Sequence, residues 1–211
     1  MEQLLQRYHK IRREADSYRA ELICVSKYAS DRAVEALIAA GVRDFGESRP
    51  QQLRDRAQRW PECRWYMIGP LQRNKAKYIA RYAAGWVSVE SLECAEEVVR
   101  RRDDMVPPLE VMLQINCFGL TRQHGVAESA ALELYKQLRH LPQLQVVGLM
   151  AMVPPGEDVT LCVQMLKRLK AEVATPSMRH ICVGMSHDYH QALAAGSTVI
   201  RVGSALFGAT H

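Results

Sequence analysis

The sequence has no apolar run long enough to cross a membrane, because none of its apolar stretches reaches the ~18 consecutive residues that a spanning helix needs. Its start, residues 1–20, is amphipathic and charged, and lacks the apolar core and small-residue cleavage site of a secretory signal. Low-complexity linkers and internal repeats are also missing. We therefore expect a cytoplasmic protein and a single domain over residues 1–211.

Closely spaced cysteine pairs are missing as well. None of the six cysteines belongs to a C-x-x-C pair, and most of them lie inside apolar segments. This spacing does not match a disulfide framework or a zinc site. We predict buried free thiols and no metal site.

The chain also lacks a strong charge of one sign, since 28 Lys and Arg stand against 23 Asp and Glu for a net charge of +5. Much of the basic excess is arginine along predicted helices, such as Arg54, Arg56 and Arg59, which is typical of a solvated helix face. No basic motif with interleaved aromatic residues appears. We expect neither a nucleic acid nor a membrane as a partner.

The sequence does have short apolar runs that alternate with helical patterns, as in parallel strands joined by crossover helices. The predicted strands are Leu22–Ser26, Asp44–Gly46, Trp65–Ile68, Trp86–Val89, Glu110–Ile115, Val146–Met150, His180–Val183 and Thr198–Val202. The clearest helices between them are Asp31–Ala40, Gln51–Arg59, Asn74–Tyr82, Leu92–Arg102, Glu128–Arg139, Val159–Ala174 and Tyr189–Ala195. A further helix, Glu2–Tyr18, precedes the first strand and is expected to cover the bottom or the side of the domain.

This alternation predicts an α/β fold, and two architectures share the pattern. A (β/α)8 barrel needs roughly 200 residues, and an open doubly wound sheet reads similarly. Eight strand–helix units within 211 residues, with no second domain, favour the closed TIM barrel with an extra N-terminal helix.

Lys27 is the first candidate reactive residue, because it directly follows the apolar strand that ends at Ser26. Active sites of such barrels lie where the strands end. Desolvation there is expected to favour the uncharged amine, which condenses with aldehydes. A surface lysine at a strand end is the alternative on this residue alone.

Two glycine–serine loops follow the last two predicted strands, at Gly184–Asp188 and Gly203–Gly208. Glycines allow close backbone approach, the hydroxyls of Ser186 and Ser204 add donors, and a short helix beginning near Ser204 would present N–H groups to an anion. Barrels often hold a phosphate at these loops. We predict a phosphate site there.

Arg201 stands two residues before Gly203, where its side chain either enters the barrel or lies on the outside of the strand. A guanidinium keeps its proton at accessible pH. Facing a pyridine nitrogen, it would donate a hydrogen bond and leave that nitrogen unprotonated.

At this point nearly the whole chain resembles the pyridoxal phosphate homeostasis proteins, which are single-domain barrels similar to the N-terminal domain of alanine racemase. The matching segments are Val25-Ser26-Lys27, Ala40-Gly41, Asp44-Phe45-Gly46-Glu47, Ile68-Gly69, Leu71-Gln72, Asn74-Lys75, Ser88-Val89 with Ser91, Gly148–Met152, Gly184-Met185-Ser186 with Asp188, and Arg201–Gly208.

The resemblance implies that Lys27 holds pyridoxal 5′-phosphate (PLP) as a Schiff base and that Arg201 faces the pyridine nitrogen. It further implies that Ser186, Gly203 and Ser204 hold the phosphate, with Asn74 and Met150 lining the pocket. The implied role is intracellular PLP, vitamin B6 and amino-acid homeostasis, by a monomer in the cytoplasm. The partners to be expected are PLP itself and PLP-dependent apoenzymes.

The chain departs from that family's pattern at several places near the motifs. Ser48 replaces an asparagine, Tyr28 a threonine, Tyr66 and Pro70 two histidines, and His124 a lysine. The two histidine changes remove polar groups from the end of the third strand. They are expected to affect ligand exchange or a partner surface.

The resemblance to alanine racemases raises the question of turnover. Those enzymes draw a second base, a tyrosine, from an additional β domain, whereas this chain ends at His211, just after the last predicted barrel unit. We expect binding and delivery of PLP rather than efficient catalysis, with room for a weak PLP-dependent side activity. Two alternatives stay open: a PLP-dependent amino-acid racemase or related enzyme with a base such as His187 or Tyr66, and a Schiff-base aldolase that uses no cofactor.

Overall fold

Strands and helices alternate along the chain in the computed structural model, which describes residues 1–208. The strands are β1 (Glu21–Val25), β2 (Asp44–Glu47), β3 (Arg64–Met67), β4 (Gly85–Val89), β5 (Leu109–Asn116), β6 (Val126–Ala127), β7 (Leu144–Ala151), β8 (His180–Cys182) and β9 (Val199–Val202). The helices are α1 (Glu2–Ser17), α2 (Asp31–Ala39), α3 (Pro50–Arg59), η1 (Arg73–Lys75, a 3-10 helix), α4 (Ala76–Tyr82), α5 (Leu92–Arg100), α6 (Glu128–Leu138), α7 (Val159–Val173), α8 (Tyr189–Ala195) and α9 (Ser204–Phe207).

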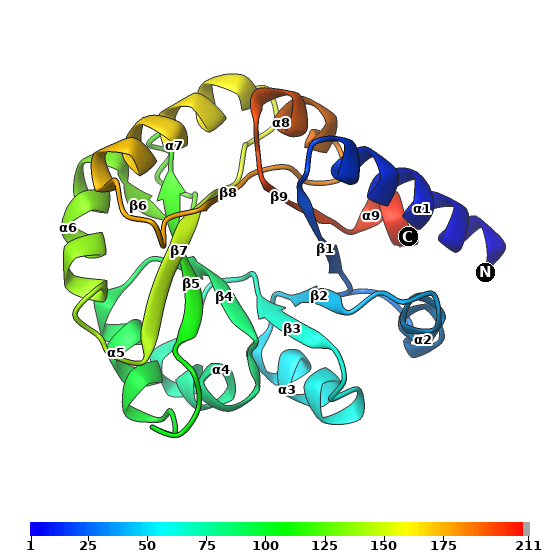
Figure 1. Cartoon of the computed structure of the whole chain (residues 1–211), viewed down its shortest axis with the longest axis horizontal. Helices are drawn as coiled ribbons and strands as arrows, with labels where there is room; N and C mark the ends of the chain where they lie inside the picture. Colours follow the sequence, from blue (N-terminus) through cyan, green and yellow to red (C-terminus); the bar gives the residue numbers. More distant parts are fainter. Residues whose placement is uncertain (209–211) are drawn as a thin grey trace.

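The strands close into a parallel ring with helices around it (Figure 1). Their order is β4-β3-β2-β1-β9-β8-β7-β5, and the pairing of β4 with β5 completes the circle. The two-residue β6, which the sequence did not predict, pairs in the described chain with the carboxyl end of β5. The closed (β/α)8 barrel is confirmed, and the open doubly wound sheet is wrong.

The barrel has two apolar layers because strand side chains point alternately inward and outward. The inward cluster is small and contains Ile23, Val87, Met112, Val147, Met150, Cys182 and Val199. The outward side chains join a larger cluster between the strands and the surrounding helices. Among the latter, Phe45 and Trp65 stack on neighbouring strands with ring centroids 5.0 Å apart.

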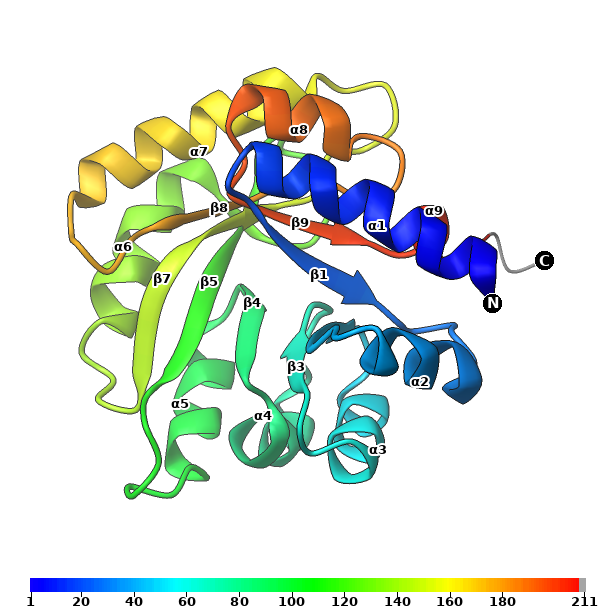
Figure 2. The ribbon, with the colours of Figure 1, turned by 45° about the vertical axis from the view of Figure 1, so that its right-hand side comes forward.

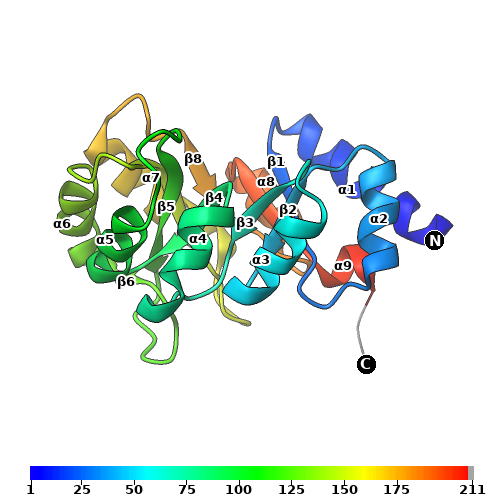
Figure 3. The same ribbon diagram turned by 90° about the horizontal axis from the view of Figure 1, so that it is seen from below.

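Helix α1 completes the ring of helices on the side of the barrel. The helix after the last strand, α9, is only four residues long, so the space between α8 and α2 is left for α1. α1 buries Leu4, Ile11 and Ala15 and runs beside α9 and α2 (Figures 2 and 3). The Arg7 Nε atom donates to the Leu206 carbonyl at 2.8 Å, which ties both ends of the described chain together.

Two further sequence predictions can be compared with the structure. The helix expected over Asn74–Tyr82 is divided into η1 and α4. All six cysteines are free, and five of them are buried, while Cys94 is half-buried. Within residues 1–208, no helix has the length and apolarity needed to span a bilayer, and no three His, Cys, Asp or Glu side chains gather as metal ligands.

Candidate functional site

A cavity of about 650 Å³ opens at the carboxyl ends of the barrel strands. Its wall is built from residues at or just after the ends of β1, β2, β3, β5, β7, β8 and β9. Backbone segments approach one another closely here: a Cβ on Gly69 would lie 2.4 Å from the Ser48 carbonyl oxygen. This end of a (β/α)8 barrel is where ligands bind.

Lys27 lines the cavity from the turn that follows β1. Its Nζ lies 5.0 Å from the ring centroid of Tyr28, and the Gln52 side chain donates to its carbonyl at 3.0 Å. The lysine is exposed, so the expectation that the protein itself desolvates this amine is wrong. The turn carries Lys27 beyond the apolar strand and leaves its side chain exposed at the cavity.

The two glycine–serine loops meet on the part of the cavity wall next to the Lys27 turn, because β9 pairs with β1. The Gly203 and Ala205 N–H groups converge on Ser186 Oγ, at 3.2 and 3.0 Å, and Ser204 starts α9 beside them. Gly184 has a φ of +114°, which favours glycine, and it turns the chain out of the strand. The predicted loops thus lie together at the cavity, and two of their N–H groups are partnered by a serine hydroxyl.

The Arg201 side chain points into the barrel, which is one of the two orientations that the sequence left open. It is 4% exposed, lines the cavity, and donates to the carbonyls of Cys182 and Ala151 at 3.2 and 3.1 Å. It also donates to Cys182 Sγ at 3.0 Å, and burial raises the pKa of that thiol despite the nearby guanidinium. None of the ion pairs among residues 1–208 includes Arg201, so a rigid cation remains at the cavity floor.

Gln114 is a polar cavity residue that the sequence analysis missed. It is 3% exposed near the end of β5 and lines the cavity. The signal was present, because Gln114 follows Met112 with the period of two that places both inside the barrel. Gln114 lies within a strand and outside every motif that the sequence analysis used, so none of those motifs distinguished it.

Asn74 and Met150, which the resemblance assigned to the pocket, are not among the residues that line this cavity in the described chain. Asn74 is exposed on η1. Met150 is fully buried in the inward cluster and is in register with Gln114 and Cys182 on the adjacent strands. The structure therefore gives neither residue a place on the cavity wall.

The two candidate bases of the racemase alternative lie in different places. His187 lines the cavity, with Nε2 3.4 Å from Asp188 Oδ2. Tyr66 packs inside the barrel against Gly85, where a Cβ would meet the tyrosine ring at 2.8 Å. Burial raises the pKa of Tyr66, and the negative charge of Asp44 at the start of β2 raises it further. Tyr66 is thus at the opposite end from the cavity, and the suggestion that it serves as a base is wrong.

Glu47 is a second polar residue whose importance the sequence did not show. It ends β2, is 0% exposed, and accepts a hydrogen bond from Ser26 Oγ at 2.6 Å. Burial raises the pKa of Glu47 to about 7, although the Ser26 hydrogen bond and the charges of Arg56 and Lys27 oppose that rise. A carboxyl group that titrates near neutral pH therefore lies beside the Lys27 turn.

Most departures from the resembled family gather at the cavity, since four of the five line it: Tyr28, Ser48, Pro70 and His124. His124 Nδ1 lies 3.1 Å from Glu90 Oε1, and the other Glu90 oxygen accepts from Gly125 N at 2.6 Å. This pair anchors the loop after β5 at the rim. The differences thus affect the entrance and wall of the cavity and leave Lys27, Arg201 and the serine loops intact.

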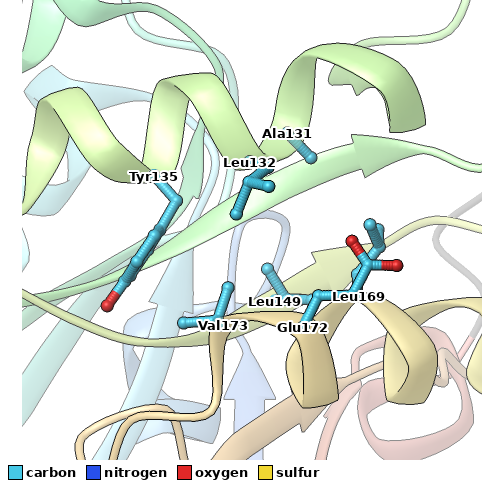
Figure 4. Close-up of a pocket in the computed structure, with 7 residues that line it drawn as sticks. All are labelled: Ala131, Leu132, Tyr135, Leu149, Leu169, Glu172 and Val173. Carbon is cyan, nitrogen blue, oxygen red and sulfur yellow. The ribbon is translucent and has the colours of Figure 1, made fainter.

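A second hollow, between α6 and α7, is too small and too apolar to be a comparable binding site (Figure 4). Its volume is about 10 Å³, and its lining is apolar except for Glu172 and Tyr135. This is the space of about one water molecule. The cavity at the strand ends is therefore the candidate site.

The comparisons with known proteins agree with this geometry. The family model described as "Alanine racemase, N-terminal domain" matches residues 1–211. The pyridoxal phosphate homeostasis protein of Escherichia coli K12 is 32% identical over 198 residues, which cover 89% of this chain and 85% of that protein. The chain belongs to the alanine racemase N-terminal domain family, and within it to the group of pyridoxal phosphate homeostasis proteins.

Solved structures show the same barrel. PipY of Synechococcus elongatus PCC7942 without PLP aligns with a TM-score of 0.87 and 30% identity, over 96% of this chain and 99% of that one. The structure of PipY with PLP bound aligns with a TM-score of 0.81 and 29% identity, over 97% of this chain and 100% of that one.

Proposed function

We propose that this chain binds pyridoxal 5′-phosphate in the 650 Å³ cavity and serves PLP homeostasis in the cytoplasm. The observation that carries the proposal is the convergence on one cavity of a free lysine, a buried arginine and two serine loops. The relatives named for PLP homeostasis and the PLP-bound PipY structure support it.

The serine loops suit the phosphate of this cofactor. Two N–H groups already converge on Ser186 Oγ, and the hydroxyls of Ser186 and Ser204 face the same cavity. N–H groups and hydroxyls are the donors that protein phosphate sites use. Ser186, Gly203 and Ser204 would therefore hold the phosphate.

Lys27 suits the aldehyde of the cofactor, and Arg201 suits the ring nitrogen at the opposite end of the pyridine ring. When bound, the cofactor supplies an aldehyde for a Schiff base with a primary amine and a ring that withdraws electrons. The free Lys27 amine would make that linkage, and the buried Arg201 guanidinium would donate to the ring nitrogen without giving up its proton. Gln114 adds a polar side chain on the same wall.

An arginine at the ring nitrogen also bears on turnover. A guanidinium leaves that nitrogen unprotonated, and the ring is then a weaker electron sink than beside a carboxylate, which would hold the nitrogen protonated. We expect the protein, as a monomer of one domain, to hold PLP and deliver it to apoenzymes without efficient catalysis. The relatives carry the name of a homeostasis protein, which agrees with this expectation.

The test compares visible absorption spectra of the wild type and Lys27→Ala after incubation with PLP, followed by borohydride reduction and peptide mapping. Lys77→Ala is the matched control, because Lys77 Nζ also lies over its neighbouring tyrosine, at 5.1 Å from the Tyr78 ring, yet is not among the residues lining the cavity. A yellow wild type and control, with the label on Lys27, is the expected result. A wild type that stays colourless would refute the proposal and favour an aldolase without cofactor.

One observation favours a second candidate function, a PLP-dependent amino-acid racemase or related enzyme. His187 lines the cavity and contacts a buried carboxylate, an arrangement suited to a base. We expect no product from L-alanine or D-alanine above the level of Lys27→Ala. Product that disappears in both Lys27→Ala and His187→Gln would establish the enzyme.

A further inference from the structure

The Lys27 turn is held by its backbone, and the contacts come from two neighbouring elements. The Ala29 N–H donates to the Ser26 carbonyl at 2.8 Å, which closes the turn. Gln52 on α3 donates to the Lys27 carbonyl at 3.0 Å, and Arg56 Nη2, one helical turn later, donates to the Ala29 carbonyl at 2.8 Å. The backbone of the turn is therefore fixed from α3, while the lysine side chain stays free.

Arg56 is the buried member of this arrangement, although its sequence context indicated a solvated helix face. It is 7% exposed and lies over the Trp60 ring, 5.3 Å from the centroid. Its Nη1 is 3.1 Å from Asp31 Oδ1, at the start of α2, and its Nε is 3.6 Å from Glu47 Oε1. One guanidinium thus links α2, β2 and the end of the Lys27 turn.

Glu47 completes the arrangement from the barrel side. One oxygen accepts from Ser26 Oγ and contacts Arg56, and the other is buried without a hydrogen-bond partner in the described chain. The charged groups that face it are Arg56 from α3 and Lys27 from the turn. β3 adds none, because the register partner of Glu47 there is the buried Met67.

We propose that Arg56 and Glu47 are positioning residues that clamp the Lys27 turn and hold its amine at the cavity. The inference rests on the proposed function, since Lys27 is the residue that takes the cofactor. Neither residue is among those lining the cavity, so both act through the turn.

The clamp has a charged and an uncharged state. Burial raises the pKa of Glu47 to about 7, so its carboxylate forms as the pH rises through neutrality. The carboxylate accepts a stronger hydrogen bond from Ser26 and attracts Arg56, whereas the protonated group does neither as well. The contacts of Glu47 with Ser26 and Arg56 are therefore strongest on the alkaline side of that pH, although burial of the charge lowers the stability of the whole fold there.

The first measurement is amide hydrogen exchange of residues 26–31 without cofactor, in wild type, Arg56→Met, Glu47→Gln and the double variant. Arg59→Met is the matched control, because Arg59 lies on the same helix, also pairs with Asp31, is exposed, and within residues 1–208 has no hydrogen bond or ion pair to Ala29 or Glu47. The second measurement is the rate at which PLP labels Lys27, followed by absorbance from pH 5.5 to 8.5.

We expect Arg56→Met to speed exchange of the Ala29 amide by about tenfold and to slow labelling by a similar factor, as the loss of one hydrogen bond from a charged donor implies. Arg59→Met should stay within about twofold of the wild type. Exchange in the wild type, corrected for its intrinsic pH dependence, should slow as the pH rises through about 7, and Glu47→Gln should remove that change.

Equal exchange in Arg56→Met and Arg59→Met would overturn the clamp, and so would an unchanged pH profile in Glu47→Gln. If Arg56→Met does not fold, the double variant and Glu47→Gln decide, because neither leaves a buried carboxylate without its cation. Exchange is measured without PLP, so a protein that never binds the cofactor would refute the proposed function and leave the clamp to be judged on its own result.

Discussion

Lys27 and Arg201 face the same cavity, yet the protein holds them in opposite ways. The Arg201 side chain is buried and bonded at both terminal nitrogens, whereas the Lys27 side chain is exposed and only its backbone is fixed. A group that recognises a ring must be rigid, because rigidity lowers the entropy lost on binding. A group that forms and releases a bond must move. With PLP bound as proposed, this difference would separate recognition of the ring by Arg201 from the covalent linkage at Lys27.

Removal of the rigid Arg201 guanidinium is expected to have the largest effect on PLP affinity. Arg201→Met should lower PLP affinity by about 100-fold, since a buried, charged hydrogen bond contributes roughly 1.5–3 kcal/mol. Titration followed by absorbance measures it, with Arg179→Met as control, because that exposed arginine pairs with Glu110 on another strand. Wild-type affinity in Arg201→Met would show that recognition does not depend on this residue.

Glu47, beside the Lys27 turn, makes the stability of the protein depend on pH. The raised pKa of Glu47 means that the folded protein binds more protons than the unfolded chain between its ordinary value of 4.5 and about 7. The Glu47 contribution to the free energy of unfolding therefore falls as the pH rises through that window, by about 3 kcal/mol in total.

Glu47→Gln should remove this contribution, so urea unfolding at pH 5 and pH 8 should show the variant gaining stability relative to wild type at the higher pH. Glu35→Gln is the control, because this exposed carboxylate on α2 pairs with Arg59 on the surface. If both variants change equally between the two pH values, Glu47 does not titrate as the geometry implies.

The smallest expected effect concerns the serine loops. Ser186→Ala should weaken PLP binding by about tenfold and leave pyridoxal, which has no phosphate, unchanged, because one hydroxyl bonded to a charged phosphate contributes roughly 1.5 kcal/mol. Ser129→Ala, an exposed serine on α6, is the control. An equal loss for both ligands would show that Ser186 supports the loop without contacting the phosphate.

The sequence predicted the barrel, the Lys27 segment and the meeting of the two serine loops, because strand-end motifs are local and parallel strands end at one face. It did not predict Gln114, whose role depends on which side of β5 faces inward. It placed Arg56 with Arg59 on a solvated face, since neither periodicity nor composition distinguishes a buried arginine from an exposed one. Burial of Arg56 arises from the packing of α3 against the Lys27 turn.

Closure of the ring orders events during synthesis of the chain. Strand β1 pairs with β9, and Arg7 bonds to Leu206, so these segments become neighbours only after all the residues between them have been made. Until then the growing sheet keeps two unpaired edges, and contacts of such long sequence separation form slowly. A nascent chain therefore carries its lysine turn well before its serine loops exist. A complete cavity therefore requires β9 and the loop that follows it.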